Sequence, residues 1–298
     1  MIELIFLGTS CMMPTKERNH QAIFLSYKNH GILFDCGENT QRQLKIAGIK
    51  PSKITKILIS HWHGDHVLGL PGLLQSLNAS EYEGTLEIYL PKGDKKHFDY
   101  MLKAFPFDML IETKIIEVDK EGMFYENDDF YLEAYELVHG IKTLGFNFIE
   151  KDKRKIKLSE VKKHGISQGP LLGKIQKGID ITYKGKKFKA DDLSYIVKGK
   201  KISYIADTML CDKCDLMVKE ADLLISESAF SKEHMDKADS FKHMTAEQAA
   251  LLASRANVKK LILTHFSQRY KTTENLLEEA KDVFSNTVCA YDFMKIKI

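Results

Sequence analysis

The sequence has no long hydrophobic stretch. None of its apolar runs approaches the roughly 18 residues that a membrane-spanning helix needs. Residues 1–7 are too short for the apolar core of a secretory signal, contain a glutamate and follow no basic segment. We therefore expect no membrane partner and a cytoplasmic protein.

Cysteine is also scarce. The chain has 5 cysteines among 298 residues, an odd number that excludes a complete disulfide framework. Cys211 and Cys214 have CxxC spacing, but no second CxxC or nearby CxxH pair accompanies them. This spacing is weak evidence for zinc, and a structural or incidental role is the simpler interpretation.

Net charge is small but unevenly distributed. The composition, 44% hydrophobic and 29% charged, is typical of a folded globular protein with a net charge of +3. Residues 151–189 hold 13 Lys and Arg against 3 Asp and Glu, so their net charge is 13 − 3 = +10 and the remainder carries 3 − 10 = −7. Such asymmetry suggests an acidic polymer as partner. A solvated lysine-rich loop is the simpler alternative.

Apolar strand patterns alternate with helical patterns along most of the chain. Strands are expected at 2–7, 22–27, 31–34, 54–59, 86–90, 110–118, 130–138, 144–150, 201–206, 223–225, 258–263 and within 288–298. Helices are expected at 39–47, 95–105, 158–164, 246–256 and 272–284, with Thr245 and Gln248 forming a capping box. The pattern predicts an α/β layered domain over residues 1–298, interrupted by a basic insertion that has no convincing core pattern.

Three histidines and one aspartate fall within six residues, directly after the apolar run 57–59. His61 and His63 alternate as strand-end residues do, whereas Asp65 and His66 stand where a helix begins. A strand-to-helix turn often carries function on a rigid scaffold. Because imidazole is a favoured ligand of zinc and other transition metals, this cluster indicates a metal site rather than a polar surface turn.

Three later strands also end on a residue that can bind a metal ion. The apolar runs before His139, Asp207 and His265 resemble the one before His61, and α/β folds place their sites beyond strand ends. A lone histidine at a strand end is more often structural, but the repeated placement favours seven ligands. We predict one ion held by His61, His63 and His139, and a second ion held by Asp65, His66 and His265. Asp207 is expected to bridge the two ions. The N and O donors suit two Zn²⁺, with Mn²⁺ or Co²⁺ as alternatives.

Two metals roughly 3.5–4 Å apart suit phosphoester hydrolysis by a shared hydroxide. Asp65 is placed to orient or deprotonate this nucleophile. The leaving oxygen needs a proton, for which His243 is our candidate donor, with Glu227 holding its imidazole. A plain surface role for His243 is the alternative.

The His-x-His-x-Asp-His cluster with its later ligands resembles the metallo-β-lactamase superfamily. That resemblance implies an αββα sandwich, with two mixed sheets flanked by helices in four layers. The superfamily includes hydrolases of lactams, thioesters and phosphodiesters, so this likeness alone leaves the substrate open.

Finer motifs resemble the ribonuclease Z family, which processes tRNA 3′ ends. Residues 14–19 match its PxKxRN loop, and residues 34–41 resemble its first block. Residues 226–229 and 243–245 occupy the places of its HEAT and HST loops, with Ser226 and Met244 as departures that put local packing in doubt. The basic insertion, 151–190, lies where the family has a flexible tRNA-binding arm, and Gly169-Pro170 resembles that arm's signature.

The resemblance implies a short-form enzyme, a homodimer whose arm reaches the tRNA bound by its partner. It implies cleavage of precursor tRNA after the discriminator base, leaving a 3′ hydroxyl on the tRNA and a 5′ phosphate on the trailer. Substrate contacts are then expected from Lys16, Arg18, Asn19, Gly169 and Pro170. Two alternatives remain: a small-molecule hydrolase of the same fold, and an RNA-binding protein with a relic metal site.

Overall fold

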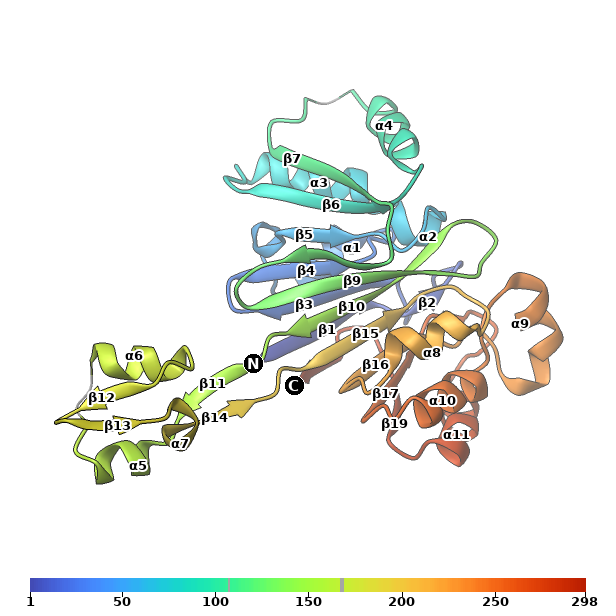
Figure 1. Cartoon of the computed structure of the whole chain (residues 1–298). Helices are drawn as coiled ribbons and strands as arrows, with labels where there is room; N and C mark the ends of the chain where they lie inside the picture. The colour runs from blue at the N-terminus through green and yellow to red at the C-terminus, as the bar shows by residue number, and fades with distance from the viewer. Residues whose placement is uncertain (107, 167–168) are drawn as a thin grey trace. The chain divides into compact units, whose positions relative to one another are not determined.

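The computed structural model describes residues 1–106, 108–166 and 169–298 and divides into two compact units (Figure 1). The larger unit comprises Met1–Glu126, Leu132–Phe148 and Lys201–Ile298, and the smaller one comprises Asn127–Tyr131 and Ile149–Lys200. In the described part of the chain, no helix is long and apolar enough to cross a membrane.

The first sheet is mixed. Its order is β20 (Lys295–Lys297), β1 (Ile2–Gly8), β3 (Ala22–Tyr27), β4 (His30–Phe34), β5 (Lys56–Leu58), β6 (Thr85–Pro91) and β7 (Glu112–Val118). Strands β20 to β4 pair antiparallel, whereas β4 to β7 pair parallel. The parallel half brings the carboxyl end of β5, and the cluster after it, to one edge of the sheet.

The second sheet has the order β19 (Thr287–Cys289), β17 (Leu261–Thr264), β16 (Leu223–Glu227), β15 (Lys201–Ile205), β10 (Thr143–Glu150), β9 (Phe130–Leu137) and β8 (Gly122–Glu126). Strands β15, β16, β17 and β19 run parallel. Their carboxyl ends therefore share one edge, which is where Asp207 and His265 follow.

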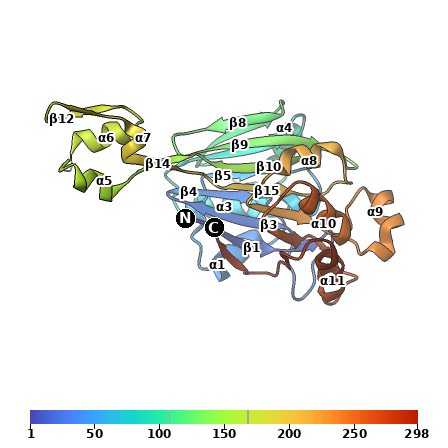
Figure 2. The ribbon, with the colours of Figure 1, turned by 60° about the horizontal axis from the view of Figure 1, so that its bottom comes forward.

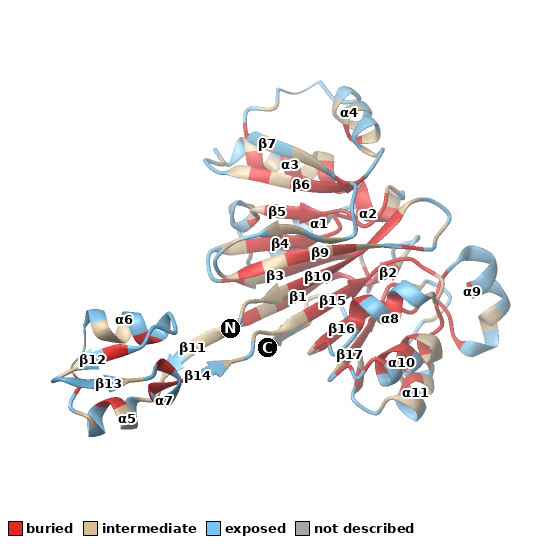
Figure 3. Cartoon of the chain, in the orientation of Figure 1, coloured by how far each residue is buried: buried red, intermediate tan, exposed pale blue. Residues whose placement is uncertain are grey.

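Helices cover the outer faces of both sheets, as Figures 1 and 2 show. The first sheet packs with α1 (Thr40–Ile46), α2 (Gly64–Val67), α3 (Leu70–Ala79) and α4 (Lys95–Lys103), and the second with α8 (Asp212–Val218), α10 (Ala246–Arg255) and α11 (Glu274–Val283). Between the sheets, the Phe34 ring lies 5.3 Å from Tyr204 and 6.5 Å from Phe146. The predicted αββα sandwich is confirmed, and buried residues concentrate in its inner layers (Figure 3).

Most predicted elements occur within a few residues of their expected bounds, and Thr245 and Gln248 form the predicted capping box. The last segment divides between the sheets, because β19 joins the second and β20 the first. In the larger unit two helices were not predicted, α8 and α9 (Met235–Phe241), and in the insertion neither were the helices Pro170–Gln176 and Ala190–Leu193. In α9 the only buried residue is Ala238, so its sequence has no apolar stripe to detect. The short strands β2 (Ser10–Cys11) and β18 (Phe266–Ser267) pair in parallel, and the 3₁₀ turns are Pro51–Lys53 and Lys232–His234.

The smaller unit has its own core. Its elements are β11 (Lys153–Ile156), α5 (Leu158–Lys163), α6 (Pro170–Gln176), β12 (Ile181–Tyr183), β13 (Lys186–Phe188), α7 (Ala190–Leu193) and β14 (Ser194–Val197). Strand β11 pairs antiparallel with β14, and β12 with β13. The buried residues are Val161, Ile166, Ile175, Ile181, Ala190 and Leu193. They come one or two at a time from short elements and a loop, so no core pattern can be recognised in this part of the sequence.

Candidate metal centre

Four strands end next to the cluster, as their sequences predicted. His61 and His63 follow β5, and Asp65 and His66 lie in α2 immediately after them. His139 follows β9, Asp207 follows β15, and His265 follows β17 in a left-handed conformation with φ 60°. The structure brings all seven predicted side chains together.

The first group consists of His61, His63, His139 and Asp207, whose ligand atoms lie within 4.8 Å of one another. His63 Nδ1 lies 3.0 Å from His61 Nε2 and 3.3 Å from His139 Nε2. Asp207 Oδ2 lies 3.6 Å from His61 Nε2 and 3.8 Å from His139 Nε2. Three imidazole nitrogens and one carboxylate oxygen thus face a common point.

The second group consists of Asp65, His66, Asp207 and His265, all buried. Asp207 Oδ1 lies 3.2 Å from His265 Nε2 and 3.4 Å from His66 Nε2. Asp65 Oδ2 lies 3.4 Å from His265 Nε2 and 3.5 Å from His66 Nε2. The two oxygens of Asp207 therefore face different groups, as a bridging carboxylate would.

These distances fit metal ligands. A tetrahedral zinc ion with bonds of about 2.0–2.1 Å separates its ligand atoms by about 3.3–3.4 Å. The 3.0 Å between His61 Nε2 and His63 Nδ1 is an ordinary hydrogen-bond distance, but most of the other separations are longer. Among the described residues, the buried His66 Nε2 and Asp207 Oδ1 have no hydrogen-bond partner. The cluster, in this fold, suggests a divalent metal site.

The charges of the site also match a cation. Burial alone would raise the pKa of Asp207, but the imidazoles of His265 and His66 hold that pKa well below its usual range. Burial lowers the pKa of His61 well below its usual range, and the neighbouring His66 lowers it further. Burial would lower the pKa of His66, but the carboxylates of Asp65, Asp207 and Asp35 raise it well above its usual range, so this ring is held among negative groups that would also attract a metal ion. Metal binding uses the neutral imidazole and the ionised carboxylate.

Three of the histidines have a fixed partner on the outer ring nitrogen, whereas the buried His265 Nδ1 has no hydrogen-bond partner among the described residues. His66 Nδ1 lies 2.8 Å from Asp35 Oδ2, and that oxygen also accepts a 2.6 Å bond from the Tyr204 hydroxyl. His61 Nδ1 lies 3.0 Å from the Ser60 hydroxyl, and His139 Nδ1 lies 3.0 Å from the Lys242 carbonyl oxygen. Such partners orient the ring and leave the other nitrogen free for a metal.

Sequence reasoning did not assign roles to these partners. Asp35 follows the strand β4, so its strand-end position was an available signal. Tyr204 stands inside an apolar strand and is indistinguishable there from a core residue. Lys242 holds the His139 ring through its main-chain carbonyl, which no side-chain motif can reveal, and its Nζ also donates to the His139 carbonyl oxygen at 3.3 Å.

His243 and Glu227 lie beside the cluster, paired as expected. His243 Nδ1 lies 2.9 Å from Glu227 Oε1, and His243 Nε2 lies 4.0 Å from Asp207 Oδ2. Glu227 is fully buried and also accepts the main-chain N–H groups of Thr208 and Ala229. Burial lowers the pKa of His243, but the carboxylates of Glu227 and Asp207 outweigh it and raise the pKa to about 9. The two carboxylates thus favour the protonated form of the His243 imidazole.

A pocket of about 770 Å³ opens onto the cluster. Its wall includes His63, Asp65 and His243, together with aromatic and cationic side chains. The Arg269 guanidinium lies 5.0 Å from the centre of the Phe230 ring, and Phe241 is exposed beside it. The pocket can therefore admit a ligand that carries both rings and negative charge.

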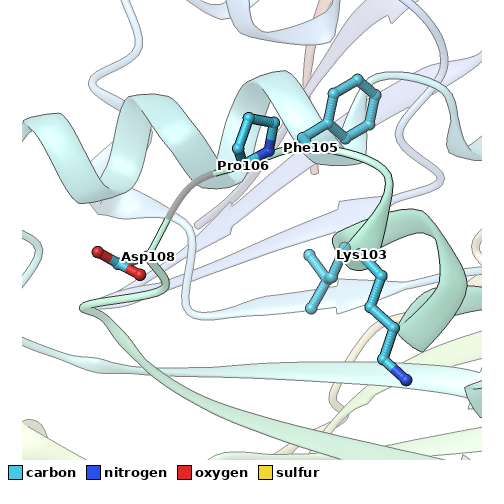
Figure 4. Close-up of a pocket in the computed structure, with 5 residues that line it drawn as sticks. Lys103, Phe105, Pro106 and Asp108 are labelled. Carbon is cyan, nitrogen blue, oxygen red and sulfur yellow. The ribbon is translucent and has the colours of Figure 1, made fainter.

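A second, more open pocket is lined by Leu102, Lys103, Phe105, Pro106 and Asp108 (Figure 4). It contains none of the predicted site residues, and its single lysine and aspartate suggest no catalytic pair.

Comparison with known proteins identifies the family. The metallo-beta-lactamase superfamily model matches residues 15–149, and a beta-lactamase superfamily domain model matches residues 176–266. The chain is 39% identical over 292 residues to ribonuclease Z of Protochlamydia amoebophila, covering 98% of this chain and 95% of that protein. The chain belongs to the ribonuclease Z family. This is a family of endoribonucleases within the metallo-β-lactamase hydrolases.

Further comparisons support the same family and the same fold. Ribonuclease Z of Methanothermobacter thermautotrophicus is 38% identical over 299 residues, covering 100% of this chain and 97% of that protein. The crystal structure of human tRNase Z, short form, matches with a TM-score of 0.71 and 27% identity over 99% of each chain. A metallo-beta-lactamase fold protein from Bacillus subtilis, at 19% identity, matches with a TM-score of 0.72 over 99% of this chain and 98% of that chain, which supports the fold alone.

The two departures from ribonuclease Z motifs are accommodated by packing. Met244 is fully buried in the core between the second sheet and its helices. Ser226 is fully buried within β16, and its hydroxyl donates to the Glu227 carbonyl oxygen at 3.0 Å. Neither residue disturbs the pair formed by His243 and Glu227.

The loop 14–19, which resembles the ribonuclease Z signature, presents its residues unequally. Lys16 is exposed. Arg18 is only 8% exposed, and its guanidinium donates to the carbonyl oxygens of Tyr270 at 2.6 Å and Ser267 at 3.4 Å. Asn19 donates to the Glu38 carbonyl oxygen at 2.8 Å. In this conformation Arg18 and Asn19 anchor the loop, and Lys16 is the cation that reaches solvent.

In the smaller unit, Gly169 and Pro170 are exposed at the start of α6. Gly169 has φ 139° and ψ −159°, a conformation that side chains disfavour. Residues 167 and 168 lie outside the described residues.

Proposed function

We propose that this chain is a zinc-dependent endoribonuclease that removes the 3′ trailer from precursor tRNA after the discriminator base. The products would be a tRNA with a 3′ hydroxyl and a trailer with a 5′ phosphate. One observation carries the proposal: two ligand groups share Asp207 next to a protonatable His243, in a chain 39% identical to a ribonuclease Z.

We assign His61, His63 and His139 to one ion, Asp65, His66 and His265 to the other, and Asp207 to both. Two divalent ions, when bound, would activate water and neutralise charge on the attacked phosphoryl group. Zinc suits this donor set of imidazole and carboxylate, and Mn²⁺ or Co²⁺ are the alternatives.

Asp65 would orient the attacking water and accept its proton. Its Oδ2 faces His66 and His265 and also accepts a 2.7 Å hydrogen bond from the main-chain N–H of Met12. His243 would donate the proton that the leaving 3′ oxygen needs. Glu227 would hold the imidazolium, since its own position is fixed by two main-chain N–H groups.

Substrate would be gripped mainly through phosphates. Nine exposed lysines lie in the described part of the segment 151–189: Lys155, Lys162, Lys163, Lys174, Lys177, Lys184, Lys186, Lys187 and Lys189. Lysines at a duplex supply affinity without reading sequence. We therefore assign tRNA binding to this arm, including Gly169 and Pro170, and a contact nearer the cut to Lys16. A homodimer, with each arm serving its partner's tRNA, remains a prediction.

The proposal is tested by incubating the full chain with a precursor tRNA, with and without a chelator, and mapping the cut and its end groups. We expect one cut after the discriminator base, with the stated end groups, that chelator abolishes and zinc restores. Cleavage elsewhere, a 3′ phosphate on the tRNA, or full activity in chelator would contradict it. Turnover of bis(p-nitrophenyl) phosphate without tRNA cleavage would favour the small-molecule hydrolase.

A further inference from the structure

Cys211 and Cys214 face each other. Their sulfur atoms lie 3.6 Å apart, and Cys214 N–H donates to the Cys211 carbonyl oxygen at 2.9 Å in the turn that joins them. The pair follows β15 and begins α8, within a β15–α8–β16 unit whose strands are parallel. A CxxC at this position of a βαβ unit is the arrangement of thiol–disulfide redox motifs.

The two thiols differ in access. Cys211 is half-buried, whereas Cys214 is fully buried. The hydrogen bond from the Cys214 thiol, together with main-chain N–H groups of Cys214 and Lys213, lowers the pKa of Cys211 to about 6 despite its partial burial. The same hydrogen bond raises the pKa of Cys214 well above its usual range, and burial raises it further. An accessible thiolate next to a protected thiol corresponds to an attacking and a resolving cysteine.

A metal role for this pair has no support. The clusters of three or more His, Cys, Asp or Glu ligands found among the described residues contain neither Cys211 nor Cys214. Two thiols alone leave a zinc ion without its usual four protein ligands.

We propose that Cys211 and Cys214 form a redox-active dithiol that reacts with the disulfide of a small thiol, such as oxidised glutathione. The Cys211 thiolate attacks one sulfur of the small disulfide, which forms a mixed disulfide and releases one small thiolate. Cys214, on losing its proton, attacks the Cys211 sulfur and releases the second thiolate. The protein dithiol loses two protons and two electrons in becoming a disulfide, and the small disulfide takes them up to become two thiols. This inference is independent of the proposed cleavage of tRNA.

The test uses the full chain, first reduced and then equilibrated with mixtures of reduced and oxidised glutathione. After acid quenching and alkylation, mass spectrometry of the intact protein and its peptides locates the bond. We expect a Cys211–Cys214 disulfide that forms as oxidised glutathione increases and that dithiothreitol reverses. Cys214→Ser should instead accumulate a glutathione adduct on Cys211. Cys289→Ser removes another half-buried cysteine and should behave like the unchanged protein.

A second measurement needs no substitution. Alkylation of Cys211 by iodoacetamide should rise through a midpoint near pH 6, and at pH 7 it should be at least about 10-fold faster than alkylation of Cys289, whose pKa burial raises to about 11. The proposal is overturned if no Cys211–Cys214 disulfide forms in excess oxidised glutathione, or if Cys211 and Cys289 react at equal rates.

Discussion

The metal centre of the larger unit and the basic smaller unit are built on different principles. The centre collects side chains from four strand ends separated by up to 204 residues in sequence, from His61 to His265, and most of them are buried. The smaller unit is local: its core joins residues within 161–193, and nine lysines of the segment 151–189 are exposed. Loss of one ligand should therefore abolish most of the activity of the metal centre, whereas loss of single lysines should reduce the tRNA affinity of the smaller unit gradually.

The largest effect is expected from His61→Ala combined with His63→Ala. Removing two imidazoles from the first ligand group should lower tRNA cleavage by at least about 10³-fold, since metal catalysis supplies several kcal/mol. The metal content measured by elemental analysis should fall below the value of about two equivalents that we expect for the intact protein. His30→Ala is a matched control that should retain both metal and activity. Processing that survives the double substitution would favour an RNA-binding protein with a relic site.

His243→Ala should lower kcat by about 10²–10⁴-fold, because a positioned general acid contributes that much. Unlike the ligand substitutions, it should leave metal content and tRNA affinity unchanged. Since His243 also lies within ligand distance of Glu227 and His265, loss of metal in this variant would reassign it as a ligand.

Neutralising lysines of the basic arm should weaken tRNA binding and leave the catalytic step intact, the opposite of what is expected for His243→Ala. Replacing Lys162, Lys163, Lys186 and Lys187 by Gln should raise KM for precursor tRNA by roughly 10-fold or more and flatten its salt dependence, because fewer counterions are released on binding. Turnover at saturation and hydrolysis of bis(p-nitrophenyl) phosphate should stay the same. The matched control replaces Lys45 and Lys120, which are exposed in the larger unit, and should change neither. An unchanged KM would remove the arm from tRNA binding.

The pH profile distinguishes the roles within the centre. A general acid must be protonated, so kcat should fall as pH rises through the pKa of His243, which the neighbouring carboxylates raise to about 9 against burial. Glu227→Gln removes one of these charges and should move the falling limb of the profile to lower pH by about one unit. If the falling limb of the kcat profile does not move in this variant, a group other than His243 is responsible for it.

The sequence was sufficient for the layered sandwich of the larger unit, because its apolar strands alternate with helical patterns, and for the seven clustered side chains, because residues at strand ends carry a local signal. It was not sufficient for the smaller unit, whose buried residues come one or two at a time from short elements. Asp35 and Tyr204 were not assigned, since their roles arise from a pairing across 169 positions that no local pattern encodes. Arg18 is the opposite case, a residue whose local motif indicated one contact while the folded chain shows another. Its motif suggested a phosphate contact, but the folded chain places its guanidinium against main-chain carbonyls.

The smallest effects concern that loop and separate its two cations. Arg18→Ala should lower the free energy of unfolding by about 1–3 kcal/mol, because it removes charged hydrogen bonds to part-buried main-chain carbonyls. It should leave the salt dependence of tRNA binding unchanged. Lys16→Ala should leave stability unchanged and weaken binding a few-fold, since an exposed cation contributes one phosphate contact. Thermal unfolding and salt-dependent binding measure both. If Arg18→Ala reduces the salt dependence as much as Lys16→Ala does, Arg18 contacts RNA in the complex. Its guanidinium would then break its hydrogen bonds to the main-chain carbonyls, and the loop would rearrange on binding.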